Sequence, residues 1–217
     1  MDLDNFSNKK YKIIEGIPRF VASENFTSSF GLQWNEFQKT QLDSHTNTTM
    51  SEDRVRTALP IPLESIKGLK IIEAGSGAGR FTEVLLKYGA IVYSFDLSNA
   101  VSANFANNMP HKNLTIFQGD IEDIPFNDNF FDISICLGVM QHTRDFSKSL
   151  QEISRVTRAG GIISFDHYKT HIGHYTSLYL VYWMIIKRIP KKFQLSVTNL
   201  LTKIFFPIHW VFRKNSL

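Results

Sequence analysis

The stretch Ile71-Ile72-Glu73-Ala74-Gly75-Ser76-Gly77-Ala78-Gly79-Arg80 decides the fold. An apolar run leads into three glycines at alternate positions, and the sequence then takes on helical character. Glycine lets the backbone turn sharply and approach a ligand closely, and the start of a helix offers unpaired backbone N–H groups. The stretch therefore predicts a strand, a tight turn and a helix, although a glycine-rich turn alone does not identify a binding site.

Short apolar runs alternate with amphipathic segments between residues 69 and 167, which is typical of βαβ units around a parallel sheet. The sequence therefore predicts an α/β fold, a Rossmann-like three-layer sandwich. We expect strands at 69–73, 91–96, 114–117, 131–136 and 161–165, and helices at 80–88, 98–108 and 145–157, the second capped by Ser98.

Two carboxylates follow strands of this predicted sheet. Asp96 ends the second strand, where it can accept hydrogen bonds from both ribose hydroxyls of a nucleoside. Asp120 follows the third strand and can accept a hydrogen bond from an adenine amino group. A dinucleotide fingerprint would have its third glycine where Arg80 stands, so the pattern favours S-adenosylmethionine (SAM), whose cationic sulfonium and ammonium groups suit an acidic crevice.

The ordered set 73–79, 96–98, 119–121, 124–126, 131–132 and 158–161 resembles class I SAM-dependent methyltransferases of the type 11 kind. The resemblance covers about half of the chain. It implies SAM as cofactor and direct transfer of its methyl group to an acceptor. The cofactor-binding residues that we expect are Glu73, Gly75, Ser76, Gly77, Asp96, Leu97, Asp120, Ile121 and Leu137.

The leader carries a second, narrower resemblance. Residues 15–21, 30–34 and 40–44 are similar to the leader of methyltransferases from bacterial surface-polysaccharide biosynthesis. This resemblance implies an oxygen of a sugar, a glycan or another small molecule as the methyl acceptor. Trp34 is expected either to lie over the cofactor as part of a lid or only to anchor the leader.

His142 follows the fourth predicted strand and is the candidate general base, since deprotonating a hydroxyl favours a group with a near-neutral pKa. The competing interpretation is that His142 packs against the cofactor or caps the next helix. Two other functions stay open at this point. A nicotinamide-dependent oxidoreductase would share the glycine turn and Asp96, and a truncated protein could keep the cofactor fold without activity.

The segment after the fifth predicted strand reads as two apolar helices, 175–189 and 193–206. Class I methyltransferases resemble one another in a seven-stranded sheet that ends in an antiparallel hairpin, but no strand-like run follows Phe165. We therefore expect a five-stranded sheet in the order 3-2-1-4-5 without that hairpin. The predicted regions are a leader or lid at 1–62, the SAM-binding domain at 63–167 and a basic helical tail at 168–217.

Charge is distributed unevenly along the 217 residues. The net charge is +4, but eight Lys and Arg residues follow Asp166, the last acidic residue, so the preceding part holds 16 basic and 20 acidic residues and carries −4. An acidic body disfavours nucleic acid as a partner, whereas the basic apolar tail suits peripheral contact with an anionic membrane surface. Packing of the tail on the domain is the simpler expectation.

The remaining composition points to a metal-free protein of the cytoplasm. Cys136 is the single cysteine, which excludes an internal disulfide and a cysteine-rich zinc site. No secretory signal is visible at the N-terminus, and the longest apolar run is shorter than the roughly 20 residues that span a bilayer. We expect a cytoplasmic location with, at most, peripheral membrane contact.

Overall fold

The computed structural model describes residues 6–7, 10–22, 27–167, 186, 188–190, 193–194 and 196–204. The chain divides into two compact units, Met1–Tyr168 and Lys169–Leu217. In the second unit, residues 193–194 and 196–204 are helical, which agrees with the helix predicted at 193–206. The helix predicted at 175–189 lies almost entirely outside the described residues.

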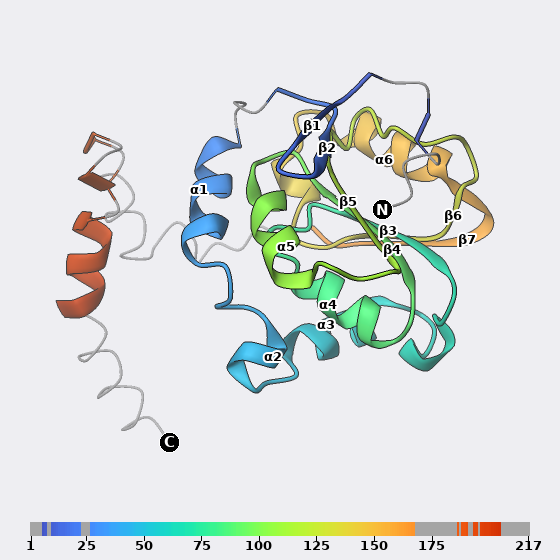
Figure 1. Ribbon diagram of the computed structural model, residues 1–217, viewed down its shortest axis with the longest axis horizontal. Coiled ribbons are helices and arrows are strands. Elements are labelled where there is room, and N and C mark those ends of the chain that lie inside the picture. Colours follow the sequence, from blue (N-terminus) through green and yellow to red (C-terminus); the bar gives the residue numbers. More distant parts are fainter. Residues whose placement is uncertain are drawn as a thin grey trace. The chain divides into compact units, whose positions relative to one another are not determined.

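A seven-stranded sheet forms the centre of the first unit, in the order β1-β2-β5-β4-β3-β6-β7 (Figure 1). All neighbouring strands pair in parallel except β1 and β2. The expectation of a five-stranded sheet was therefore wrong, because two short strands from the leader extend the sheet beside β5. The strands are β1 Lys12–Ile14, β2 Ile17–Arg19, β3 Lys70–Ala74, β4 Ile91–Asp96, β5 Leu114–Gln118, β6 Phe131–Cys136 and β7 Thr157–Phe165.

Helices connect and cover these strands. The two elements of 3-10 geometry, η1 Leu63–Ser65 and η2 Met140–His142, precede β3 and α6. Asp145 caps α6 by accepting a hydrogen bond from the backbone N–H of Lys148 at 3.0 Å. The helices are α1 Ser28–Glu36, α2 Asp43–Thr46, α3 Met50–Ala58, α4 Arg80–Lys87, α5 Ala100–Asn108 and α6 Phe146–Val156.

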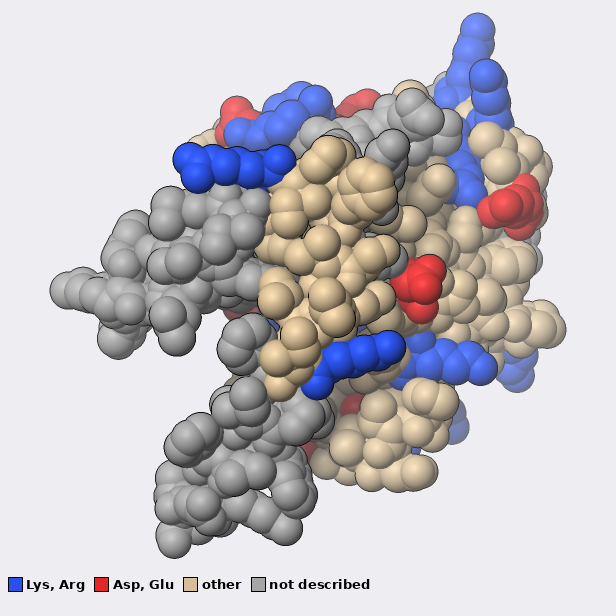
Figure 2. Space-filling view, turned by 90° about the vertical axis from the view of Figure 1, so that its left-hand side faces the viewer, with Lys and Arg blue, Asp and Glu red and all other residues tan. Residues whose placement is uncertain are grey.

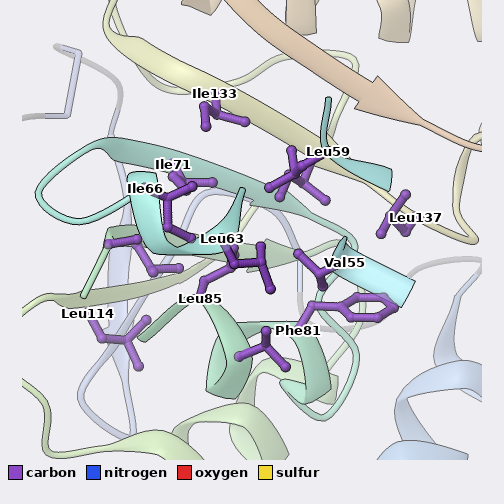
Figure 3. Packing of buried hydrophobic residues seen from close by; sticks show 14 of the residues in the cluster. Val55, Leu59, Leu63, Ile66, Ile71, Phe81, Leu85, Leu114, Ile133 and Leu137 are labelled. Atoms are coloured by element: carbon purple, nitrogen blue, oxygen red, sulfur yellow. The ribbon is translucent and has the colours of Figure 1, made fainter. Parts of the chain in front are cut away.

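Alternation along the buried strands divides the core into two layers. Ile71 of β3 belongs to one apolar cluster and its neighbour Ile72 to another, as expected from the two-residue period of a strand. The first cluster joins the sheet to α3, α4 and α5 through residues such as Val55 and Leu85 (Figure 3). The second joins the opposite face to α6 through Ile153 and to an aromatic group that includes Phe126. The result is a three-layer sandwich.

The leader hairpin turns at Glu15 and Gly16, whose φ angles are +55° and +76°. Positive φ at both central residues is the geometry of a tight two-residue hairpin turn. Arg19 of β2 fastens the hairpin to the sheet, because its guanidinium donates to Gln118 Oε1 at 2.8 Å and to Asn99 Oδ1 at 2.6 Å. All the strands predicted from the sequence lie between residues 69 and 165, so the sequence analysis missed this hairpin.

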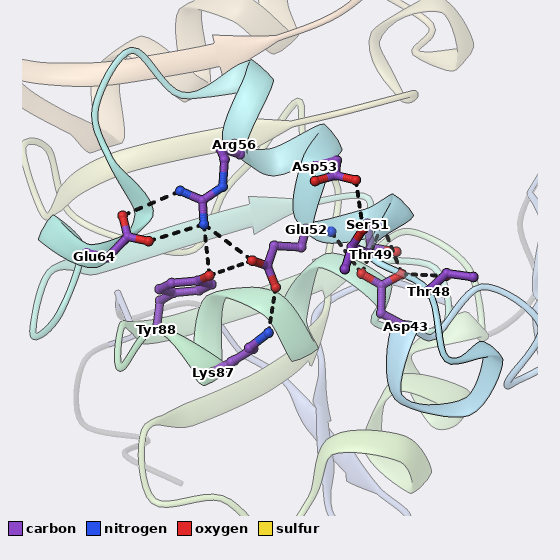
Figure 4. Close-up of polar contacts among 10 residues, drawn as sticks. All are labelled: Asp43, Thr48, Thr49, Ser51, Glu52, Asp53, Arg56, Glu64, Lys87 and Tyr88. Carbon is purple, nitrogen blue, oxygen red and sulfur yellow. Dashed lines mark hydrogen bonds and ion pairs between the residues drawn. The ribbon is translucent and has the colours of Figure 1, made fainter.

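Polar contacts hold α3 against α4 (Figure 4). Glu52 accepts hydrogen bonds from Lys87 Nζ at 2.6 Å and from the Tyr88 hydroxyl at 2.5 Å, and these contacts lower the pKa of Glu52 to about 2. Arg56 links the same carboxylate to Glu64 at 3.2 Å. Residues of both α3 and α4 line a pocket at the carboxyl edge of the sheet, so this network positions two walls of that pocket.

The described residues contain neither a membrane-spanning helix nor a cluster of metal-binding side chains. Among the described residues, none of the helices is long and apolar enough to cross a membrane. Within the same residues, no group of three or more His, Cys, Asp or Glu side chains could hold a metal ion.

Figure 2 shows the left-hand side of the view in Figure 1, where acidic side chains (red) lie in small separate groups rather than in one continuous patch.

Candidate active site

The predicted strand, turn and helix around the three glycines are present as β3, a tight turn and α4. Gly75 has a φ of +76°, and a Cβ atom there would lie 2.2 Å from Val139 Cγ2. Gly77 has a φ of +53°, and a Cβ atom there would lie 3.2 Å from Trp34 Nε1. Only glycine therefore fits Gly75 without a shift of the neighbouring chain. The turn brings its backbone close to the residues that follow β6 and to α1.

Asp96 stands at the end of β4 beside this turn. The backbone N–H of Gly77 donates to Asp96 Oδ2 at 3.0 Å, and the backbone N–H and hydroxyl of Ser98 donate to Oδ1 at 2.8 and 2.7 Å. Burial raises the pKa of Asp96, and these hydrogen bonds oppose the rise. The carboxylate is oriented firmly and still lines the pocket, so it retains lone pairs for a ligand.

Asp120 follows β5 and faces the same space. Its Oδ1 accepts a hydrogen bond from the backbone N–H of Glu122 at 3.0 Å, and its Oδ2 lies 2.5 Å from a guanidinium nitrogen of Arg144. Arg144 also approaches Glu122 at 3.7 Å. Ile121, beside Asp120, is an apolar residue of the same wall. This end of the site combines carboxylates with apolar side chains.

A pocket of about 300 Å³ joins these residues at the carboxyl ends of β3, β4, β5 and β6. Ligands of open α/β sheets bind in crevices at this edge, and the volume suits a small organic molecule. The leader contributes Phe30 and Trp34 from α1. Of the residues predicted from the sequence, the pocket is lined by Gly75, Ser76, Gly77, Asp96, Leu97, Asp120, Ile121, Leu137 and His142.

Glu73 does not line the pocket, in contrast to the other predicted residues. Its side chain is buried behind the turn, where Glu73 Oε2 accepts hydrogen bonds from the hydroxyls of Thr82 at 2.5 Å and Ser94 at 2.8 Å. Asn104 donates to both hydroxyls. Burial raises the pKa of Glu73 to about 7. Glu73 thus connects β3, α4 and β4 below the glycine turn.

His142 lies at the end of η2 and lines the pocket. Its imidazole ring packs against Phe30 of α1, with 5.2 Å between the ring centroids. Trp34 lies one turn further along α1, against Gly77. Asn35 fixes this helix by donating to the backbone carbonyl of Asn99 at 3.0 Å. The leader helix therefore forms one side of the pocket, and His142 stands where α1 meets the loop after β6.

Sequence reasoning missed several lining residues. Arg54 reaches the pocket from α3 and Phe81 from α4, while Gln41 comes from the segment before α2. No local motif marks Arg54 or Gln41, because their position depends on how the leader packs on the domain. Arg80 was noticed only as a replacement for a glycine. Its place directly after the glycine turn was the signal that could have identified it as a lining residue.

Comparisons with known proteins agree on one domain. The family model described as "Methyltransferase domain" matches residues 72–165. Demethylmenaquinone methyltransferase of Corynebacterium efficiens is 33% identical over 144 residues, which cover 64% of this chain and 60% of that protein. Malonyl-[acyl-carrier protein] O-methyltransferase of Pectobacterium atrosepticum is 34% identical, with coverage of 45% and 38%. The chain thus spans less than two thirds of the length of these curated relatives.

Solved structures share the fold. A protein of Methanococcus maripaludis described as an S-adenosyl-L-methionine-dependent methyltransferase has a TM-score of 0.52 at 21% identity, with coverage of 85% of this chain and 87% of that chain. Phosphoethanolamine N-methyltransferase 1 of Haemonchus contortus, in complex with phosphoethanolamine and S-adenosylhomocysteine, has a TM-score of 0.53 at 20% identity, with coverage of 70% and 34%.

Proposed function

We propose that this SAM-dependent methyltransferase domain, whose cofactor is S-adenosylmethionine, methylates an oxygen atom of a small molecule. The observation that carries the proposal is the pocket itself, in which Asp96, Asp120 and the glycine turn converge at the carboxyl edge of the sheet. The names of two relatives specify O-methylation, namely the malonyl-[acyl-carrier protein] enzyme and the ubiquinone biosynthesis O-methyltransferase of Coxiella burnetii.

The residues of the pocket fit the cofactor. Asp96 would accept hydrogen bonds from the ribose hydroxyls, and Asp120 would accept one from the adenine amino group. Leu97 and Ile121 are apolar residues suited to the faces of the adenine ring. The hydroxyl of Ser76 is buried in the turn without a hydrogen-bond partner among the described residues, so it is available to the amino-acid part of the cofactor.

When bound, SAM supplies a methyl group on a positively charged sulfur. The chain must therefore position the acceptor, exclude water and, for a hydroxyl group, remove a proton. Phe30 and Trp34 of α1 line the pocket and are apolar residues suited to excluding water from a bound cofactor and acceptor. His142 is the candidate base, because its imidazole lines the pocket and is held by ring packing against Phe30. A carboxylate acceptor would need no base.

The glycan acceptor expected from the leader has no counterpart in the names of these relatives, which specify demethylmenaquinone, ubiquinone biosynthesis and malonyl-[acyl-carrier protein]. We therefore propose a small acceptor with a hydroxyl or carboxyl group as the first class to test. Peripheral membrane contact and a cytoplasmic location stay predictions, and the former depends on a tail that lies largely outside the described residues.

Calorimetry with S-adenosylhomocysteine and with NAD separates the methyltransferase from the oxidoreductase alternative. We expect heat of binding with S-adenosylhomocysteine alone, since Arg80 replaces the third glycine of the dinucleotide fingerprint, the one that lets the helix pack closely against the strand. Methyl-labelled SAM, incubated with catechols, demethylated quinols and malonyl thioesters, then tests transfer to oxygen. Binding of NAD without the homocysteine compound would contradict the proposal, and cofactor binding without transfer to any hydroxyl or carboxyl compound would favour the inactive alternative.

A further inference from the structure

The wall of the pocket formed by α3 and the start of α4 carries positive charge. Arg54 and Arg80 both line the pocket, and their guanidinium carbons lie 5.8 and 4.5 Å from the centroid of the same ring, that of Phe81. This wall contrasts with the region of Asp96, Asp120 and Glu122, where carboxylates gather. The pocket therefore has a cationic side and an acidic side.

Arg80 lacks a carboxylate partner among the described residues. A terminal nitrogen of Arg80 donates to Gln41 Oε1 at 2.9 Å, and Nε of Arg80 is buried without a hydrogen-bond partner among the described residues. Burial and the nearby charge of Arg54 both lower the pKa of Arg80, and the charge of Asp43 raises it without offsetting them. A half-buried cation that forms no direct ion pair is costly, and a bound anion would offset that cost.

Arg54 is held in place by the chain. Its guanidinium lies 2.5 Å from Asp166 Oδ2, while the other oxygen of Asp166 accepts the backbone N–H of Gly138. Arg54 therefore has a carboxylate partner, whereas Arg80 forms no ion pair with a carboxylate among the described residues. The planar guanidinium groups, fixed by Phe81, Asp166 and Gln41, can donate parallel hydrogen bonds to a carboxylate or phosphate group.

We propose that Arg54 and Arg80 form a subsite for an anionic group of the methyl acceptor, a carboxylate or a phosphate, an inference that rests on the proposed function. Arg54 and Gln41 lie outside residues 72–165, the part that the family model matches. Relatives share the cofactor and differ in their acceptors, so the unmatched leader is where acceptor selection is expected. The cofactor also carries a carboxylate in its amino-acid part, which is the second source of an anion that the experiment distinguishes.

The test uses the full chain saturated with S-adenosylhomocysteine, and malonate and inorganic phosphate serve as probes in separate calorimetric titrations. We expect at least one dianion to bind, and Arg54→Gln and Arg80→Gln each to weaken it roughly 10- to 100-fold, the range for losing a charge-assisted hydrogen bond. Arg80→Lys keeps the positive charge, so this variant should lose less affinity for the dianion than Arg80→Gln does. Arg158→Gln removes an exposed cation on β7 and is the matched control, with unchanged affinity.

The affinity of each variant for S-adenosylhomocysteine and for 5′-methylthioadenosine, which lacks the amino-acid part, identifies the source of the anion. Unchanged affinities for both compounds support an acceptor subsite. If Arg80→Gln weakens the binding of S-adenosylhomocysteine but not that of 5′-methylthioadenosine, the arginines bind the carboxylate of the cofactor and the proposal is overturned. Absence of dianion binding to the loaded protein overturns it too. If S-adenosylhomocysteine itself does not bind, the proposed function fails, and dianion titration of the unloaded chain still decides whether these arginines bind anions.

Discussion

Asp96 combines rigid support with access to the pocket, because Gly77 and Ser98 orient the carboxylate that is expected to bind ribose. Asp96→Ala should weaken binding of S-adenosylhomocysteine by roughly 1–3 kcal/mol, the scale of charge-assisted hydrogen bonds. Calorimetry measures the change. Asp96→Asn keeps the shape of the side chain and should lose less affinity for S-adenosylhomocysteine. Full affinity in the Ala variant would mean that Asp96 does not contribute to cofactor binding.

Glu73 is expected to make stability depend on pH. Its pKa is raised to about 7 by burial, above the ordinary value of 4.5, so the folded protein holds this proton more tightly than the unfolded chain does. The free energy of unfolding should therefore fall as pH rises from about 4.5 through 7, by at most about 3 kcal/mol for this group.

Glu73→Gln isolates this effect. The amide oxygen can still accept from Thr82 and Ser94, but the side chain cannot ionise. Urea unfolding of both proteins between pH 5 and 8 should show a shallower decline for the variant. Equal slopes would mean that Glu73 does not titrate in this range.

His142 should affect turnover more than cofactor affinity if it is a base. We expect His142→Ala to lower kcat by roughly 100-fold or more with a hydroxyl acceptor, the typical contribution of general base catalysis, and to leave binding of S-adenosylhomocysteine nearly unchanged. His111→Ala alters a histidine outside the pocket and serves as control. Unchanged turnover in the His142 variant would assign this residue a packing role against Phe30.

At the scale of single residues, the sequence predicted those pocket-lining residues that follow the ends of parallel strands. Gly75, Asp96, Ile121 and Leu137 meet because those ends share one edge of the sheet. Glu73 was expected at the same place, but its side chain points behind the turn, a direction that alternation along a short strand does not settle. The role of Arg54 depends on tertiary packing of α3 and left no local signal.

Among the elements, the leader hairpin was the main one that sequence reasoning missed. β1 and β2 have three residues each, too few for a visible alternation, and their turn uses Glu15 and Gly16 rather than a common Asn-Gly pair. The longer strands β4 and β6 were predicted with the observed bounds. Ser98 was expected to cap α5, but the helix begins at Ala100 and its cap position is Asn99.

The hairpin is held to the sheet by Arg19, whose removal should cost stability. Arg19→Met would leave Oε1 of the buried Gln118 without this donor, so we expect the free energy of unfolding to fall by roughly 1–3 kcal/mol. Urea denaturation at neutral pH measures this. Lys12→Met on the exposed strand β1 is the control and should change stability little; an equal loss in both variants would contradict the special role of Arg19.

At the scale of the whole molecule, charge and packing divide the chain at nearly the same point. The part up to Asp166 holds 20 acidic and 16 basic residues, and acidic residues are absent from the remaining sequence. The compact units divide at Tyr168. Both apolar clusters of described residues draw their members from the first unit. Both clusters are therefore built from residues that precede the basic segment.

A chain that ends at Tyr168 should fold and bind S-adenosylhomocysteine with the affinity of the full chain, because the residues that line the pocket lie between Thr27 and Arg144. Thermal unfolding and calorimetry on both chains measure this. The outer edge of β7 has no partner strand among the described residues, so the shortened chain should also aggregate more readily at high concentration. Loss of cooperative unfolding or of binding would instead show that residues after Tyr168 complete the core or the pocket. Unchanged binding with increased aggregation would assign those residues to protection of the sheet edge.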